Sequence, residues 1–411
     1  MHRRVFIAAI VCGMAVAGCG GGGGSSASGV TPAPGVDGPA WWGYGRDAQH
    51  AAQSAIATQD LNRIAWSTPV DLVPPRQANG ELLIHYGSPV VTSHNTIVVP
   101  VKTTAAGGFR VEARSGVNGG VIWSALSDYV LPAHNWVPSY GPALTSTNRL
   151  FFAGSGGRLW VMDNADSGGG TPYPVAFYGL ANYQASSATF DATVFINTPV
   201  TVDAQGNAYF GFIVTAANPA GLVSGIARVD ANGVGTWASA SFIANDAAIQ
   251  KVAMNSAPAL SADGKTVYVA VNTAAVAGTL QAGYLAALDS TTFAVKARTV
   301  LNDPSTGTPA FVSDDSSASP TVGPDGDVYY GVLERNFPTH NARGWLLHFD
   351  AALAPAGAPG SFGWDTTPSI VPASMVPSYK GGSAYLLMTK YNNYDGIGTG
   401  DGANRIAVID P

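Results

Sequence analysis

One stretch of the chain combines side chains that can stack on a small molecule with side chains that can hydrogen-bond to it. It contains His134, Trp136 and Tyr140, and it lies between two strand-like segments. Binding sites often form from loops on a rigid scaffold, so we predict that this stretch contributes to a ligand site at the mouth of a channel. The alternative is a plain connection in which Trp136 packs against the core.

A second stretch, residues 390–402, could bind a ligand or a cation. Lys390, Tyr391 and Asn392 could line a pocket, and Asp395 and Asp401 follow in a glycine-rich run. Carboxylates and backbone carbonyls are the oxygen ligands that Ca²⁺ prefers. Their spacing fits neither an EF-hand loop nor a nonapeptide repeat, so a long glycine hairpin is the alternative interpretation.

The sequence contains no complete motif of a common catalytic class. It lacks the G-x-S-x-G pattern of serine hydrolases and the H-E-x-x-H pattern of zinc proteases. Asp314 and Asp315 precede two serines, which predicts a solvated turn. The seven histidines lack the spacing of metal ligands, so we expect them in loops or satisfied in the core: His2, His50, His85, His94, His134, His340 and His348. These observations favour a protein without catalytic activity.

The first 18 residues are organised like a signal peptide. Arg3 and Arg4 precede an apolar run, residues 5–17, that is shorter than the ~20 residues of a membrane-spanning helix. The run ends in Ala17-Gly18-Cys19, which resembles the lipobox of bacterial lipoproteins. The resemblance implies cleavage before Cys19 and attachment of lipid to that residue. The alternative is an ordinary secretory signal with a chance cysteine.

The resemblance also implies a location. Gly20 follows the cysteine where aspartate would signal retention, which implies transfer to the outer membrane. We therefore predict an exported protein with a lipid anchor, facing the periplasm or the cell surface. Residues 19–39 are rich in Gly, Ser and Pro and predict a flexible tether.

Composition restricts the class of the remaining chain, residues 40–411. Hydrophobic residues make up 46% and charged residues 11% of the sequence, enough apolar surface for a large core. Fifty glycines and 27 prolines indicate many turns and favour an all-β body. The net charge of −6 and the lack of a basic cluster after residue 4 argue against nucleic acid as a partner. The only cysteines are Cys12 and Cys19, so the mature chain has no internal disulfide.

A repeated unit sets the fold. It begins with a small residue and proline, continues with an apolar strand and ends in a second strand near an aspartate. The six prolines recur every 48 to 62 residues, at Pro89, Pro142, Pro199, Pro258, Pro320 and Pro368. Proline is tolerated at the first residue of a strand because it lacks an N–H donor. Blades of a β-propeller recur at about this interval, so we predict one propeller of four-stranded blades, seven or alternatively eight in number.

Strands inside the units follow short turns. Asp263-Gly264 and Asp325-Gly326 each precede a strand of β-branched and aromatic residues, which is a strong hairpin signal. The predicted partner strands share an end at or near aspartate: 158–163, 225–230, 283–289, 344–350 and 405–410. No long segment has the 3.6-residue period of a helix. Residues 64–66 resemble the end of a first, incomplete unit. Either strands near the start of the chain close the ring of blades, or the sequence lacks a last blade.

The units resemble the A-x-D-x-x-x-G-x-x-x-W repeats of PQQ-dependent quinoprotein propellers. Ala113, Gly119 and Trp123 match that pattern, and Ala227 and Trp237 match it in a later unit. In that family the tryptophans pack between neighbouring blades, so the resemblance implies a structural role for Trp123 and Trp237. The enzymes of the family hold PQQ beneath a vicinal disulfide with Ca²⁺ bound by carboxylates, and this chain has no vicinal cysteine pair. We therefore expect no cofactor, with PQQ or Ca²⁺ as the alternative.

Three functions compete. The first is a non-enzymatic scaffold on the outer membrane that binds an envelope protein, which resembles the PQQ-like propeller lipoprotein of the outer-membrane β-barrel assembly machinery. The second is a module that binds a small molecule, a carbohydrate or a quinone in the central channel. The third is a PQQ-dependent oxidoreductase. The repeat pattern indicates the fold and leaves the choice to the site, with the scaffold favoured.

Overall fold

The computed structural model describes the body of the chain with several gaps. The described residues are 41–54, 62–74, 76, 80, 87–104, 108–134, 141–166, 170–336, 344–361, 363–391, 401–403 and 405–411. Cys19, the signal peptide and the tether lie outside them. In this described part, no helix has the length and apolar character needed to span a membrane.

The described strands form six antiparallel sheets, each made of strands that follow one another in the chain. The first contains β1 (Val90–Val91), β2 (Thr96–Lys102), β3 (Phe109–Ser115) and β4 (Val121–Ser127). The second contains β5 (Ala143–Leu144), β6 (Leu150–Ala153), β7 (Arg158–Met162) and β8 (Tyr173–Ala176). The third contains β10 (Thr201–Val202), β11 (Ala208–Val214), β12 (Gly225–Val229) and β13 (Gly235–Ser239), with β9 (Val194–Ile196) also paired to β11.

The remaining three sheets repeat the pattern. The fourth contains β14 (Lys251–Val252), β16 (Thr266–Asn272), β17 (Gly283–Asp289) and β18 (Val295–Val300), with β15 (Ala259–Leu260) also paired to β16. The fifth contains β19 (Thr321–Val322), β20 (Val328–Val332), β21 (Trp345–Phe349) and β22 (Pro355–Gly360). The sixth contains β23 (Ser369–Pro372), β24 (Tyr385–Tyr391) and β25 (Arg405–Ile409). Short helices lie between strands: α1 (Leu180–Ala185), α2 (Ser187–Thr193), α3 (Ala240–Ala244), η1 (Ser155–Gly157) and η2 (Ala373–Met375).

Proline and glycine set the strand boundaries. An inner strand begins within two residues after each of the six predicted prolines. Gly264 and Gly326 have φ of 69° and 95°, the left-handed backbone that their hairpin turns require. The prediction of an all-β chain with strands at these positions is confirmed.

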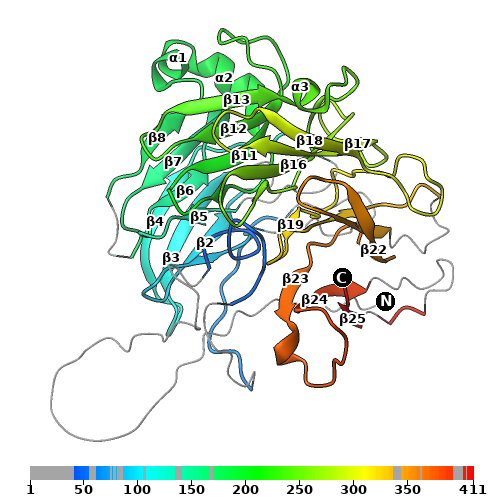
Figure 1. The fold of residues 1–411 in the computed structure, drawn as a ribbon. Helices are drawn as coiled ribbons and strands as arrows, with labels where there is room; N and C mark the ends of the chain where they lie inside the picture. The colour runs from blue at the N-terminus through cyan, green and yellow to red at the C-terminus, as the bar shows by residue number, and fades with distance from the viewer. Residues whose placement is uncertain are drawn as a thin grey trace, which may run out of the picture.

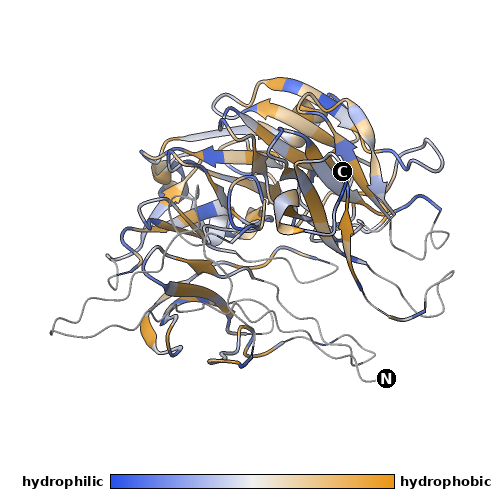
Figure 2. Cartoon of the chain, turned by 60° about the horizontal axis from the view of Figure 1, so that its bottom comes forward, coloured by the Kyte–Doolittle hydropathy of each residue, from blue (hydrophilic) through white to orange (hydrophobic). Residues whose placement is uncertain are grey.

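The sheets follow one another around a common axis, with the first strand of each nearest the centre (Figure 1). Hydrophobic residues run along the strands and hydrophilic ones gather in many of the connecting loops (Figure 2). Phe177, which follows β8 of the second sheet, packs on Phe210 and Phe212 of the third, with ring centroids 5.9 and 4.5 Å apart. The core therefore lies between successive sheets, as in a β-propeller. Six blades are formed by the described residues, and the count of seven stays a prediction.

Trp123 joins the first two blades, as its place in the repeat predicts. Its indole Nε1 donates to the carbonyl of Ala165, in the turn after β7, at 2.7 Å. Trp237 instead packs edge-to-face on Phe212 of its own sheet, at 6.1 Å.

We expect Trp123→Phe to lower the free energy of unfolding by about 1 kcal/mol, since it removes this hydrogen bond while keeping most of the aromatic contact. Urea denaturation of the wild type and the variant measures the difference. Trp237→Phe is the matched substitution. An unchanged stability for Trp123→Phe would show that the blades are held together without this bond.

Candidate functional site

The segment 41–52 lies at the axis of the propeller, where the inner strands converge (Figure 1, dark blue). Its carbonyl groups accept hydrogen bonds of 2.7 to 2.9 Å from the inner strands of five sheets. The donors are the backbone N–H groups of Val91, Leu144, Leu260, Val322 and Ile370. Each bond satisfies an edge group that the ring of sheets leaves open.

Tight turns allow the segment to circle the axis. Trp42 N–H donates to the carbonyl of Arg46 at 2.7 Å, and Ala51 N–H donates to Asp47 Oδ1 at 3.0 Å. Gly45 has φ of 60°, and a Cβ there would lie 2.8 Å from His50 Cα, so only glycine fits. The segment is thus folded by its own local contacts as well as by the blades.

Two side chains of this segment point inward among the inner strands. Tyr44 Oη donates to the carbonyl of Ser317 at 2.7 Å and lies 2.9 Å from Thr367 Oγ1. His50 is fully buried, and its Nδ1 lies 2.7 Å from the carbonyl of Pro320, so Nδ1 carries the proton. Its Nε2 lies 3.4 Å from Thr201 Oγ1. The two rings meet edge-on, with centroids 5.3 Å apart.

Both groups are held neutral at pH 7. Burial lowers the pKa of His50 to about 4, and the carbonyl of Pro320 only partly opposes this fall. Burial likewise raises the pKa of Tyr44, although its hydrogen bonds to hydroxyl groups oppose the rise. Tyr44 and His50 therefore form an uncharged, hydrogen-bonded plug at the axis, which we call the axial plug.

The residues at the axis do not fit PQQ with its Ca²⁺. Tyr44 and His50 take up the space among the inner strands, and they bind residues that follow β18 and β22. Among the described residues, no group of three or more His, Cys, Asp or Glu side chains is placed to hold a metal ion. The two cysteines of the chain, Cys12 and Cys19, are not adjacent and cannot form a vicinal disulfide.

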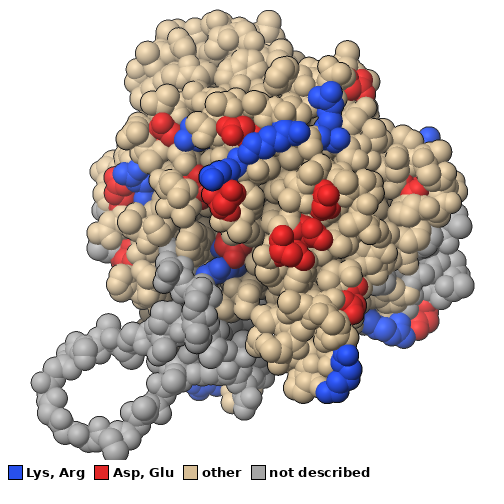
Figure 3. Space-filling model, in the orientation of Figure 1, with Lys and Arg blue, Asp and Glu red and all other residues tan. Residues whose placement is uncertain are grey.

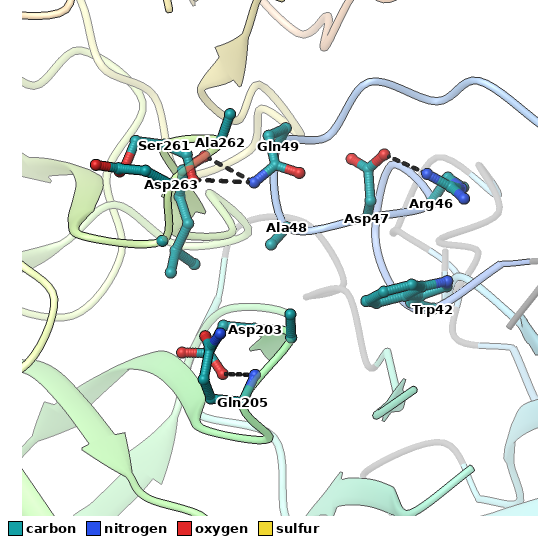
Figure 4. A pocket seen from close by; sticks show the side chains of 13 residues that line it. Trp42, Arg46, Asp47, Ala48, Gln49, Asp203, Gln205, Ser261, Ala262 and Asp263 are labelled. Atoms are coloured by element: carbon teal, nitrogen blue, oxygen red, sulfur yellow. Dashed lines mark hydrogen bonds and ion pairs between the residues drawn. The ribbon is translucent and has the colours of Figure 1, made fainter. Parts of the chain in front are cut away.

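A cavity of about 280 Å³ opens beside the plug (Figure 4). The segment Trp42–Gln49 forms one wall, and two hairpin turns, 203–205 and 260–264, form the other. Gln49 reaches across and donates through Nε2 to the carbonyls of Leu260 and Ser261, at 3.2 and 3.1 Å. The lining mixes polar and apolar surface, and we take this cavity as the candidate ligand site beside the axis.

The charged groups lining this cavity are engaged with the chain. Asp47 Oδ2 accepts from Arg46 Nη1 at 2.8 Å. Asp203 accepts from two backbone N–H groups of its own turn and from the hydroxyl of Tyr209 at 3.1 Å. The hydroxyl of Ser261 lowers the pKa of Asp263, which accepts its hydrogen bond at 2.6 Å. The cavity therefore presents no pair of carboxylates free for acid–base catalysis.

The first predicted site stretch is only partly described. His134 follows β4, is half-buried, and its Nδ1 lies 2.7 Å from the carbonyl of Pro132 in the same loop. Trp136 and Tyr140 lie outside the described residues. The prediction that the three form a ligand site stays untested.

The second predicted stretch begins in the sixth sheet. Lys390 is exposed and pairs with Asp365 at 2.6 Å, and Tyr391 ends β24. Asp401 is exposed and pairs with Arg405 at 2.7 Å, and hydrogen bonds from that guanidinium lower its pKa to about 2. Asn392 and Asp395 lie outside the described residues. The carboxylate of Asp401 thus binds arginine, and His134 lies in the loop after β4 of the first sheet, apart from this stretch.

One sequence expectation is wrong at a buried site. Asp314, predicted in a solvated turn, is fully buried and accepts from Lys251 Nζ at 2.6 Å. Tyr44 and His50 carried no motif that pointed to them, because their role depends on closing the ring of sheets. The only local signal was the aromatic and glycine-rich composition of residues 41–46.

Comparison with known proteins finds similar solved structures at low sequence identity. No family model matches the chain, and no curated protein matches it. A europium-containing methanol dehydrogenase is similar at 11% identity and TM-score 0.49, over 90% of this chain and 73% of that chain. The quinohemoprotein alcohol dehydrogenase from Comamonas testosteroni is similar at 14% identity and TM-score 0.47, over 90% and 62%. BamB from Moraxella catarrhalis is similar at 13% identity and TM-score 0.40, over 76% and 73%. The assignment of the fold rests on the sheets described above.

Proposed function

We propose that this protein is a lipid-anchored scaffold of the outer membrane that binds another envelope protein and catalyses no reaction. The observation that carries the proposal is the axial plug, because Tyr44 and His50 fill the place where a propeller enzyme would hold its cofactor. The lipobox-like Ala17-Gly18-Cys19 supports the anchor. A filled centre leaves the outer strands and loops as the surfaces for recognition.

The charge distribution suits a protein as the partner better than a highly charged molecule such as nucleic acid. Lys and Arg side chains are scattered among Asp and Glu, and most of the visible face is uncharged (Figure 3). This face offers no strong field to steer nucleic acid, and its contacts depend on shape and apolar area.

The test is recovery of a partner from solubilised outer membranes with the full-length protein as bait. We expect a labelled fatty acid to be incorporated at Cys19, and one envelope protein to be recovered in about equal amount with the bait. Cys19→Ala is the control, and we expect it to lose both the label and the partner, because the bait no longer reaches the membrane.

Two results would contradict the proposal. One is dye-linked dehydrogenase activity after addition of PQQ and Ca²⁺, which would make the protein an enzyme despite the plug. The other is a lipidated bait that recovers no envelope protein in stoichiometric amount. Loss of the lipid label alone would refute the anchor and leave the binding role.

A further inference from the structure

The outer strands of the first five sheets differ in how well their free edges are protected. These strands are β4, β8, β13, β18 and β22. A free edge carries unpaired N–H and C=O groups that can pair with a strand of another chain. Proteins commonly block such edges with proline, with charged side chains or by keeping the strand short and covered.

Four of the five edges are blocked in these ways. Pro174 lies within β8, and Pro355 and Pro359 belong to β22, and each of these residues lacks a backbone N–H donor. Lys296 and Arg298 place charges along β18. The five residues of β13 are all half-buried, and α3 begins directly after it.

The edge of β4 has none of these protective features. Its seven residues include no proline and no charged side chain. Val121, Ile122 and Leu126 are 57%, 46% and 78% exposed. A long, uncharged and apolar edge is the kind that pairs with another strand.

A groove of about 360 Å³ runs beside β4, between the first and second blades. Leu126 and Trp123 line it from β4, and Trp160 and Met162 line it from β7. Aromatic and methionine side chains around a concave site are typical of positions that bind one large apolar side chain of a partner. The groove and the open edge thus lie side by side.

We infer that β4 is the docking strand of this protein, and that its occupant is an uncharged extended segment of the envelope partner, which adds a fifth strand to the first blade. Backbone hydrogen bonds along β4 supply the affinity, and a bulky apolar side chain of the partner enters the groove at Trp123 and Trp160. The inference rests on the proposed scaffold function and names the surface that performs it.

A second copy of the chain fits this edge less well. A stable dimer buries about 1,600 Å² in total, whereas seven strand residues span only about 23 Å. Two propeller rims are convex and diverge on both sides of such a contact. A slender segment avoids this, because it can follow β4 and enter the groove at once.

The test places a photo-crosslinking phenylalanine at position 122 or 126 of the full-length, lipidated protein in its own membrane. The matched position is 408 in β25, where Val408 is 52% exposed. We expect one envelope protein to be crosslinked at 122 and 126 about tenfold more strongly than at 408, through an uncharged segment of its sequence. Leu126→Lys should lower recovery of that protein about tenfold, Val408→Lys should not, and neither should shift the thermal melt.

Other outcomes separate the two proposals. Crosslinking only between copies of this chain would replace the partner by a dimer. Adducts at 408 alone, or recovery of a partner with no adduct at 122 or 126, would overturn the role of β4 and leave the scaffold function intact. If neither adducts nor a recovered partner are found, both proposals fail.

Discussion

Replacing Asp314 by alanine is expected to lower the free energy of unfolding by about 3–5 kcal/mol, the largest single effect we predict. Asp314 and Lys251 are both fully buried, with Oδ1 and Nζ 2.6 Å apart. The carboxylate also accepts from Met254 N, from Gly278 N and from Asn272 Nδ2, at 2.8, 2.8 and 2.9 Å. Its removal leaves the buried Lys251 ammonium without a counter-charge and the N–H groups of Met254 and Gly278 without this acceptor, while Asn272 keeps its bond to the carbonyl of Val312.

The loss should depend on the charge of Lys251. Burial lowers the pKa of this ammonium group, and the adjacent carboxylate opposes the fall. We therefore expect the double variant Lys251→Met, Asp314→Ala to be more stable than Asp314→Ala alone. Urea denaturation of the four proteins of this cycle measures the coupling. Additive losses would show that the two groups do not depend on each other.

Local chemistry explains which parts of the fold could be predicted. Proline before each inner strand and glycine in the hairpin turns act within a few residues, so Pro258 and Gly264 mark strand boundaries in any context. Trp123 makes the contact with the next blade that its place in the repeat predicts, whereas Trp237 packs on Phe212 of its own sheet. Repetition then implies the radial arrangement, because each sheet must cover the apolar face of its neighbour.

Long-range contacts explain what could not be predicted. Asp314 follows a polar pattern typical of a turn, yet its partner Lys251 is 63 residues away in the chain. The axial segment has no strand pattern, because its backbone pairs with five separate sheets rather than with one neighbour. For the predicted site, composition indicated polar aromatic stretches, but His134 bonds within its own loop and Lys390 pairs with Asp365.

Acidification is expected to destabilise the protein through His50. The ring is fully buried and neutral, and burial lowers its pKa from an ordinary 6.5 to about 4. Between these two values the unfolded chain binds a proton that the folded chain does not. The contribution of His50 to stability is therefore fully present above pH 6.5 and is lost as the pH falls toward 4. The fall corresponds to about 3 kcal/mol over this window.

The free energy of unfolding at pH 7.5, 6, 5 and 4, from urea denaturation, measures this loss, with His50→Gln as the control. Glutamine can still donate to the carbonyl of Pro320, but it cannot take up a proton, so the variant should lose little stability between pH 7.5 and 5. Hydrogen bonds from Arg114 and Arg110 lower the pKa of Glu112. Protonation of such carboxylates therefore reduces stability mainly at lower pH, and equally in wild type and variant. If wild type and His50→Gln lose stability equally between pH 7.5 and 5, His50 is not held neutral at the axis and the plug is more open than its contacts indicate.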